Sequence, residues 1–233
     1  MTIAIGLLCD GGKTAIMISD REISQPAVPN LGYFYRNQAT KYRKINKTSM
    51  AVFSGPIDSE VLNHHVILDG ISASEVAVNL SKSYIEIRKS KIENFILIPL
   101  GIESLSKYLQ EKTMQPTISI EILKQVQNYQ LSCEFLICSY DESGTHLFHV
   151  ANPGSYFCYD ESGYRSIGIG AFIADSAFAY HKYTRDIKYD DAIKIGIEAK
   201  KRSEILLGVG IDTDIWKIDK SGISEIIPPD TTK

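Results

Sequence analysis

Short apolar runs with the length and composition of β-strands open the chain. They cover Ile3–Cys9, Lys13–Ser19, Tyr42–Asn46 and Ser49–Phe53. The turn sequence Asp10-Gly11-Gly12 separates the first two runs and predicts a hairpin. Residues 23–40 contain two prolines, two asparagines and a glycine, so we expect a long loop there.

A helical period replaces the strand pattern from Ile57 to Gln130. Pro56 suits the first turn of a helix, and acidic residues follow it. Ser72 or Ser74 can cap a longer helix whose apolar positions recur every three or four residues. Pro99-Leu100-Gly101 is expected to end that helix. Two further helices are expected over Ile102–Gln110 and Ile118–Tyr129.

The last hundred residues return to strands, then helices, then strands. Strands are expected over Glu134–Tyr140, Thr145–Val150, Ser155–Tyr159, Ile211–Ile218 and Ile223–Ile227, and helices over Ala171–Lys182 and Tyr189–Leu206. Because strands and helices come in blocks, the order favours antiparallel sheets covered by helices over a doubly wound parallel sheet. We expect an α+β fold in a single domain, residues 1–233, with an enlarged helical block at about 70–130.

Composition narrows the classes of partner. The chain has 233 residues, 44% of them hydrophobic, and a net charge of −3, which gives no electrostatic reason to expect nucleic acid. No run is long and apolar enough for a membrane helix or a signal peptide, so we expect a cytoplasmic protein. The four cysteines form no CxxC pair and are expected to be buried free thiols in a reducing compartment.

Two other patterns resemble ligand-binding motifs but do not have the spacing that those motifs require. Asp10-Gly11-Gly12-Lys13-Thr14 looks like the end of a phosphate-binding loop, but the spacing to the upstream glycine is wrong and a strand follows instead of a helix. His64 and His65 are adjacent, so on a helix they would not share a face as metal ligands do. We therefore expect neither a cofactor nor a metal.

The start of the chain offers a candidate nucleophile. Thr2 follows Met1, and methionine is removed when the next residue is small, so the mature chain could begin with threonine. An N-terminal threonine carries a nucleophilic hydroxyl and an α-amine that can take its proton. A nearby lysine would lower the pKa of that amine, and a carboxylate would hold the lysine in place.

Several ordered motifs resemble the proteasome β-subunits and the bacterial HslV peptidases. Thr2-Ile3-Ala4-Ile5-Gly6 resembles their Thr-x-x-x-Gly opening, and Ser19-Asp20-Arg21 the end of their second strand. Lys41-Tyr42-Arg43-Lys44-Ile45 is similar to their Lys-x-x-Lys-Ile signature, and Phe53-Ser54-Gly55 follows at the family's distance. Ser166–Ala171 and Gly208–Asp214 resemble two later glycine-rich turns. The resemblance implies a divergent stand-alone member of the N-terminal nucleophile (Ntn) hydrolases, with a four-layer αββα sandwich of two antiparallel sheets.

The resemblance also implies roles. Thr2 would be the nucleophile of a threonine-type peptidase, Lys41 would tune the electrostatics, and Asp20 would orient Lys41. The Gly55 N–H would bind the oxyanion, and Glu204 would stand for a family aspartate. A peptide or protein substrate and assembly into a homo-oligomer are also implied.

Two positions depart from the family. Ile169 and Leu207 stand where the family has serines that support its water and amine network. An inactive structural or regulatory relative is therefore an alternative. An acyl transferase, such as a peptide ligase, is another, because it would use the same acyl-enzyme.

Overall fold

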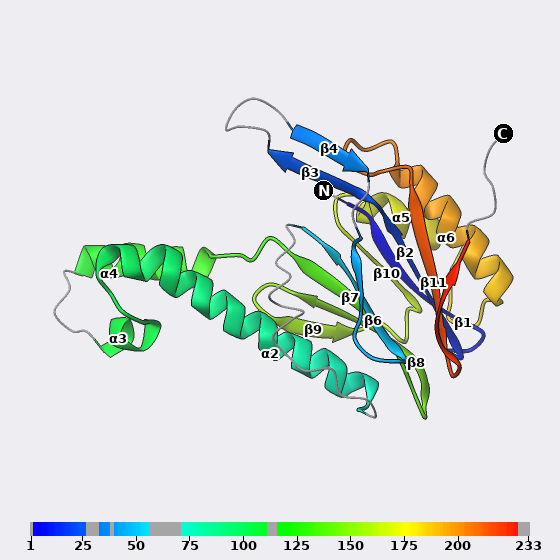
Figure 1. Ribbon diagram of the computed structural model, residues 1–233, viewed down its shortest axis with the longest axis horizontal. Helices are drawn as coiled ribbons and strands as arrows, with labels where there is room; N and C mark the ends of the chain where they lie inside the picture. Colours follow the sequence, from blue (N-terminus) through cyan, green and yellow to red (C-terminus); the bar gives the residue numbers. More distant parts are fainter. Residues whose placement is uncertain (1, 27–32, 38–39, 56–70, 111–115, 228–233) are drawn as a thin grey trace.

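Two five-stranded antiparallel sheets lie face to face at the centre of the molecule (Figure 1). This computed structural model describes residues 2–26, 33–37, 40–55, 71–110 and 116–227. The first sheet has the order β10 (Tyr164–Ile167), β1 (Ala4–Cys9), β2 (Thr14–Asp20), β11 (Thr213–Asp219) and β12 (Gly222–Ile226). The second has the order β5 (Tyr42–Lys44), β6 (Ser49–Ser54), β7 (Glu134–Asp141), β8 (Gly144–Ala151) and β9 (Ser155–Cys158).

Helices cover the outer face of each sheet. Helix α2 (Ala73–Ile92) packs on the second sheet, while α5 (Ala171–Tyr180) and α6 (Tyr189–Ser203) pack on the first. Strands β1 and β2, which form the first hairpin, are buried along their whole length, because one side of each faces these helices and the other faces the second sheet. Trp216 of β11, 1% exposed, lies in the apolar layer between the sheets. These layers confirm the predicted αββα sandwich.

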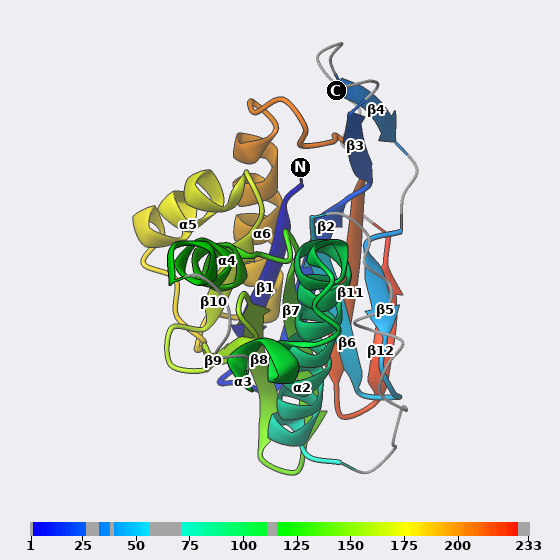
Figure 2. The ribbon, with the colours of Figure 1, turned by 90° about the vertical axis from the view of Figure 1, so that its left-hand side faces the viewer.

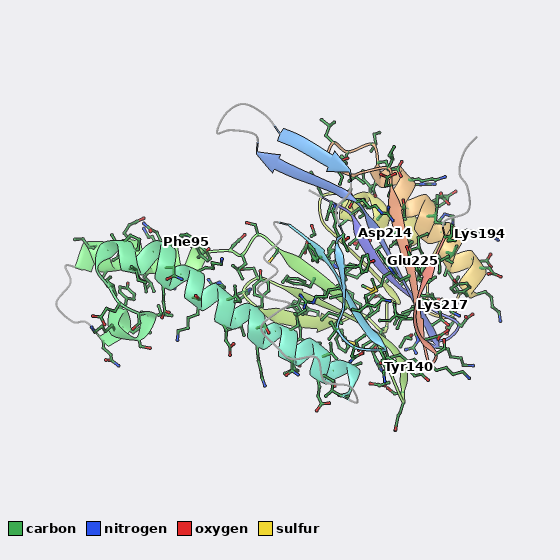
Figure 3. The ribbon with its side chains drawn as sticks, in the orientation of Figure 1. Phe95, Tyr140, Lys194, Asp214, Lys217 and Glu225 are labelled. Atoms are coloured by element: carbon green, nitrogen blue, oxygen red, sulfur yellow. The ribbon has the colours of Figure 1, made fainter. Side chains whose placement is uncertain are left out.

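A helical arm projects beyond the sheets (Figures 1 and 2). Helix α2 runs into a π-helical turn, Glu93–Leu97, and a 3-10 turn, Ile98–Leu100, and then α3 (Leu105–Gln110) and α4 (Pro116–Asn128) fold back. Gly101, with φ of +78°, ends the first part as predicted. The arm has a small apolar core of its own around Leu97 and Tyr108. Phe95 lies on its surface, 66% exposed (Figure 3).

Three predictions about this architecture were wrong. Residues within the expected loop at 23–40 form β3 (Glu22–Pro26) and β4 (Tyr33–Asn37), a separate antiparallel ribbon. Pro26 is tolerated because both strands of a two-stranded ribbon are edges. The short strand β10 was missed because its four residues are stabilised by pairing with β1, far away in the sequence. Cys158 is exposed, whereas the other three cysteines are buried free thiols as expected.

The remaining boundaries agree with the predictions to within a few residues. The helix expected to begin at Pro56 falls in 56–70, outside the described residues. Among the helices that the structure describes, none combines the length and the apolar character needed to cross a bilayer.

Candidate active site

Three of the predicted site residues meet where the ends of the two sheets come together. Thr2 immediately precedes β1, and Asp20 is the last residue of the neighbouring strand β2. The Asp20 N–H donates to the Ile3 carbonyl over 3.2 Å, which holds the two strand ends side by side. Lys41 immediately precedes β5 of the other sheet, where its carbonyl accepts a 3.0 Å hydrogen bond from the N–H of Phe53.

The side chains of these three residues form one buried hydrogen-bonded cluster. The Thr2 hydroxyl donates to Asp20 Oδ1 and accepts from Lys41 Nζ. Lys41 Nζ also donates to Asp20 Oδ1 at 2.7 Å. Thr2 is 1% exposed, Asp20 0% and Lys41 4%, so the ion pair and the hydroxyl interact in a low dielectric. The hydroxyl oxygen is therefore held beside a cation and a carboxylate.

Backbone groups fix the Asp20 carboxylate from two sides. The Ile3 N–H donates to Oδ1 at 3.2 Å, and the Gly210 N–H donates to Oδ2 at 2.8 Å. Each oxygen thus has its own donors, which sets the plane of the carboxylate and the direction in which it holds Lys41.

Burial lowers the pKa of the Lys41 ammonium, against the opposing effects of Asp20 and Glu22. Its charge therefore depends on the carboxylate beside it. A lysine in this state stabilises negative charge on the Thr2 oxygen strongly, because little water screens the interaction.

A glycine loop presses against the backbone of Thr2. A Cβ at Gly168, whose φ is +90°, would lie 2.4 Å from the Thr2 carbonyl oxygen and 2.9 Å from Ser54 Oγ. The Gly170 N–H donates to the Thr2 carbonyl at 3.4 Å. The loop can approach this closely only because position 168 has no side chain.

Glu134 binds the glycine loop at Gly168, and His149 in turn contacts Glu134. Glu134 Oε1 accepts the Gly168 N–H at 2.9 Å, and Oε2 lies 3.0 Å from His149 Nε2. Burial opposes the charge of Glu134, but the bonds from His149 and Gly168 keep the pKa of Glu134 below its usual value. Neither residue was predicted from the sequence, because their strand pattern is that of ordinary sheet residues.

Substituting Gly168 by alanine is expected to reduce the reactivity of Thr2 by roughly 100-fold, the size of effect that a small misplacement of reacting groups produces. The added methyl group would push Thr2 out of position. Gly101→Ala is the matched control, because Gly101 also has a positive φ but no atom within 4 Å of its Cβ position. Both variants should lose roughly 1–2 kcal/mol of stability from backbone strain. The measurement is the rate at which a β-lactone probe labels Thr2. Equal rates in the two variants would contradict the expected displacement of Thr2.

The two other predicted residues lie near this cluster but have different contacts. Gly55 follows Ser54 and has φ of +106°; a Cβ there would lie 2.0 Å from the Ser132 carbonyl. Glu204 caps the C-terminus of α6 and pairs with Lys200 at 2.7 Å. Ile169 and Leu207, which replace family serines, are 46% and 81% exposed.

Lys200 is a buried lysine that the sequence analysis did not name, with 1% of its side chain exposed. It lies on the same face of α6 as the buried residues Ala192 and Gly196, four residues apart along the helix. This spacing could have identified it, because a lysine on an apolar helix face is rarely buried without partners.

A second group of residues has the composition of a serine-hydrolase triad. His146 lies 2.8 Å from Ser143 Oγ through Nε2 and 2.6 Å from Asp160 through Nδ1. The Ser143 hydroxyl, however, donates to Asp141 at 2.6 Å, and Asp141 also lies 3.2 Å from His146. Asp160, and then Asp141, raise the pKa of His146. Asp141, Ser143 and His146 thus contact one another across the β7–β8 turn, and Asp160 joins them to the end of β9, so we interpret this group as one that ties the turns together.

A cavity of about 820 Å³ lies at the opposite end of β1, beside its turn to β2. Its lining includes Asp10, Lys13, Ser143 and Asp219 and none of the predicted site residues. Among the described residues, no three histidine, cysteine or acidic side chains cluster as metal ligands would. The cluster at Thr2 is therefore where the described residues best support chemistry.

Comparison with known proteins agrees with this architecture. The family model described as proteasome subunit matches residues 103–203. The structure is similar to that of an Anbu (Gly-1) mutant from Hyphomicrobium sp. strain MC1, with a TM-score of 0.65 and 11% identity, over 97% of this chain and 85% of that one. No curated protein sequence matches the chain significantly.

The layers and the structural match define the fold of the Ntn hydrolases. The family match over residues 103–203, together with this fold, supports a divergent protein of the proteasome type.

Proposed function

We propose that this protein is a threonine-type peptidase in which Thr2, exposed by removal of Met1, is the nucleophile. The observation that carries the proposal is the buried contact of the Thr2 hydroxyl with both Lys41 and Asp20. A threonine at a strand end has no structural need for a buried ion pair, since such a pair adds little net stability. Its chemical value is high, because it fixes and activates a hydroxyl.

The reaction would follow from this arrangement. Thr2 Oγ attacks the carbonyl carbon of a peptide bond and forms a C–O bond, while its proton passes to the free α-amine of Thr2, directly or through a water. The Gly55 N–H would stabilise the oxyanion. The C–N bond then breaks, the leaving amine takes the proton, and an ester on Thr2 remains. Water attacks this ester, releases the acid and regenerates the hydroxyl.

Lys41 and Asp20 act on the oxygen and not as carriers of the proton. The Lys41 ammonium lies against Thr2 Oγ and stabilises negative charge that develops there. Asp20 keeps that ammonium charged and in place, because burial by itself favours the neutral amine.

An inactive relative is the second candidate. Ile169 and Leu207 cannot replace the hydroxyl groups of the family serines, and both are exposed at the surface. An acyl transferase is a third outcome, because an amine could replace water in the attack on the ester. The substrate class, a peptide or protein, is common to the active candidates.

A cytoplasmic homo-oligomer is part of the same proposal. The arm supports assembly, because it exposes large apolar side chains, among them Phe95 at 66% and Leu109 at 70%, which a second copy of the chain would cover.

Intact mass spectrometry with a β-lactone probe tests the proposal. We expect a mass lower by one methionine and, after treatment, an adduct of the whole probe mass that peptide mapping locates on Thr2. Ring opening retains every probe atom, because the C–O bond formed on Thr2 replaces the lactone C–O bond. Retained Met1 without an adduct would contradict the proposal and favour the inactive relative.

A peptide substrate with an added amine acceptor separates the two active outcomes. Release of free acid alone indicates hydrolysis. A product joined to the amine indicates transfer.

A further inference from the structure

Lys200 extends from α6 toward the segment that precedes β11, and all three protons of its ammonium group are donated in hydrogen bonds. Its ammonium donates to the carbonyls of Gly210 and Ile211 and to Glu204, each at 2.7 Å. The side chain is 1% exposed, so water does not replace any of these acceptors. A single buried cation thus joins the end of α6 to the segment that leads into β11.

That segment leads directly to the candidate site. The N–H of Gly210 donates to Asp20 Oδ2 at 2.8 Å. The other oxygen, Oδ1, faces Thr2 and Lys41. Gly210 therefore contacts Lys200 through its carbonyl and Asp20 through its amide, and its position depends on both.

The charges around Lys200 fit this arrangement. Burial lowers the pKa of Lys200, while Glu204, Asp20 and Asp212 oppose that shift. Asp20 consequently lies between two buried lysines, and the charge of Lys200 is one of the influences that lower the pKa of Lys41. An apolar side chain at 200 would leave the carbonyls of Gly210 and Ile211 without this donor, and any neutral side chain there would remove the influence of its charge on Lys41.

We infer that Lys200 is a positioning residue that, through Gly210, sets the orientation of Asp20 and thereby of Lys41 and Thr2. The inference rests on the proposed function for its effect on reactivity, but its structural part stands apart from it. None of the predicted roles includes this lysine. Glu204, which was expected to act as a site carboxylate, acts here as the surface partner of Lys200.

Variants at this one position separate positioning from charge. Lys200→Met and the milder Lys200→Gln remove the charge, and Lys200→Arg keeps it. Lys194→Met is the matched control, because Lys194 lies on the outer side of the same helix with 75% of its side chain exposed (Figure 3). Three quantities are measured: the rate of Thr2 labelling by the β-lactone as a function of pH, hydrogen exchange of the Gly210 amide, and the titration of Lys41 by carbon-13 NMR.

We expect Lys200→Met to slow labelling by roughly 10- to 100-fold, the range that a small displacement of reacting groups produces. The Gly210 amide should exchange faster than in the parent protein. Lys41 should titrate at higher pH in the methionine and glutamine variants and at the parent pH in the arginine variant. Lys194→Met should match the parent protein in all three measurements.

A lysine that only stabilises the fold would lower the melting temperature without these changes. Parent-like labelling, Gly210 exchange and Lys41 titration in folded Lys200→Met would overturn the inference. If that variant does not fold, Lys200→Gln decides by the same criteria. If the parent protein itself is not labelled, the proposed function fails, while exchange and titration still decide whether Lys200 positions Asp20.

Discussion

Replacing Thr2 by alanine is expected to lower the rate of β-lactone labelling and of peptide cleavage by about 10⁴-fold or more, because the variant lacks the hydroxyl that we propose as the nucleophile. The fold should persist. The methyl group of alanine is smaller than the threonine side chain, and the loss of the hydroxyl's hydrogen bonds to two charged groups should cost about 1.5–3 kcal/mol of unfolding free energy. Cleavage and labelling rates are measured beside a urea unfolding curve.

Two variants control this experiment. Thr2→Ser keeps the hydroxyl and, like alanine, is small enough to allow removal of Met1, so it should retain activity. Thr48→Ala removes a threonine hydroxyl from the turn between β5 and β6 and should leave the rates unchanged. Peptide cleavage at the parent rate in Thr2→Ala would exclude Thr2 as the nucleophile.

The second large effect concerns the Asp20–Lys41 ion pair. Asp20→Asn removes the carboxylate that contacts the buried ammonium of Lys41, and Lys41→Met removes the cation that contacts the buried carboxylate of Asp20. Each is expected to cost about 3–5 kcal/mol of unfolding free energy. The double variant removes both charges, so its loss should be well below the sum of the two single losses. Urea unfolding of the four proteins gives the coupling energy.

An exposed ion pair on the arm supplies the comparison for this double-mutant cycle. Lys107 and Glu103, whose side chains are 53% and 76% exposed, form an ion pair at 2.6 Å on the arm. Removing either partner there should change stability by no more than about 0.5 kcal/mol. Additive losses at Asp20 and Lys41 would mean that the two charges do not interact as the geometry requires.

The rate of Thr2 labelling in the Asp20 and Lys41 variants tests whether the ion pair also acts on the hydroxyl. The double variant should recover stability but not Thr2 labelling, because the hydroxyl then lacks the cation that stabilises its negative charge. Recovery of both would assign the pair to folding alone.

Much of the fold could be predicted because its signals are local. Short apolar runs and turn residues predicted the hairpin of β1 and β2, and a cap at Ser72 or Ser74 with a break at Gly101 bounded the helix now seen as α2 and its turns. The strand β10 was missed because its partner β1 is distant in sequence and leaves no local pattern. The strands β3 and β4 are close in sequence, and they were missed because the prolines and the glycine of this segment have the composition of a loop.

The candidate site, like the fold, has features that the sequence predicts locally and features that depend on tertiary contacts. By itself the sequence determined the residue types of the chemistry, namely a hydroxyl at Thr2, a carboxylate at Asp20 and an ammonium at Lys41, each at the end of a predicted strand. Only the tertiary structure decided that these ends meet in a buried cluster and that Glu204 pairs with Lys200. The physical reason is that charge state and reactivity depend on burial and on distances of a few ångströms, which packing between the layers sets and which no spacing along the chain encodes.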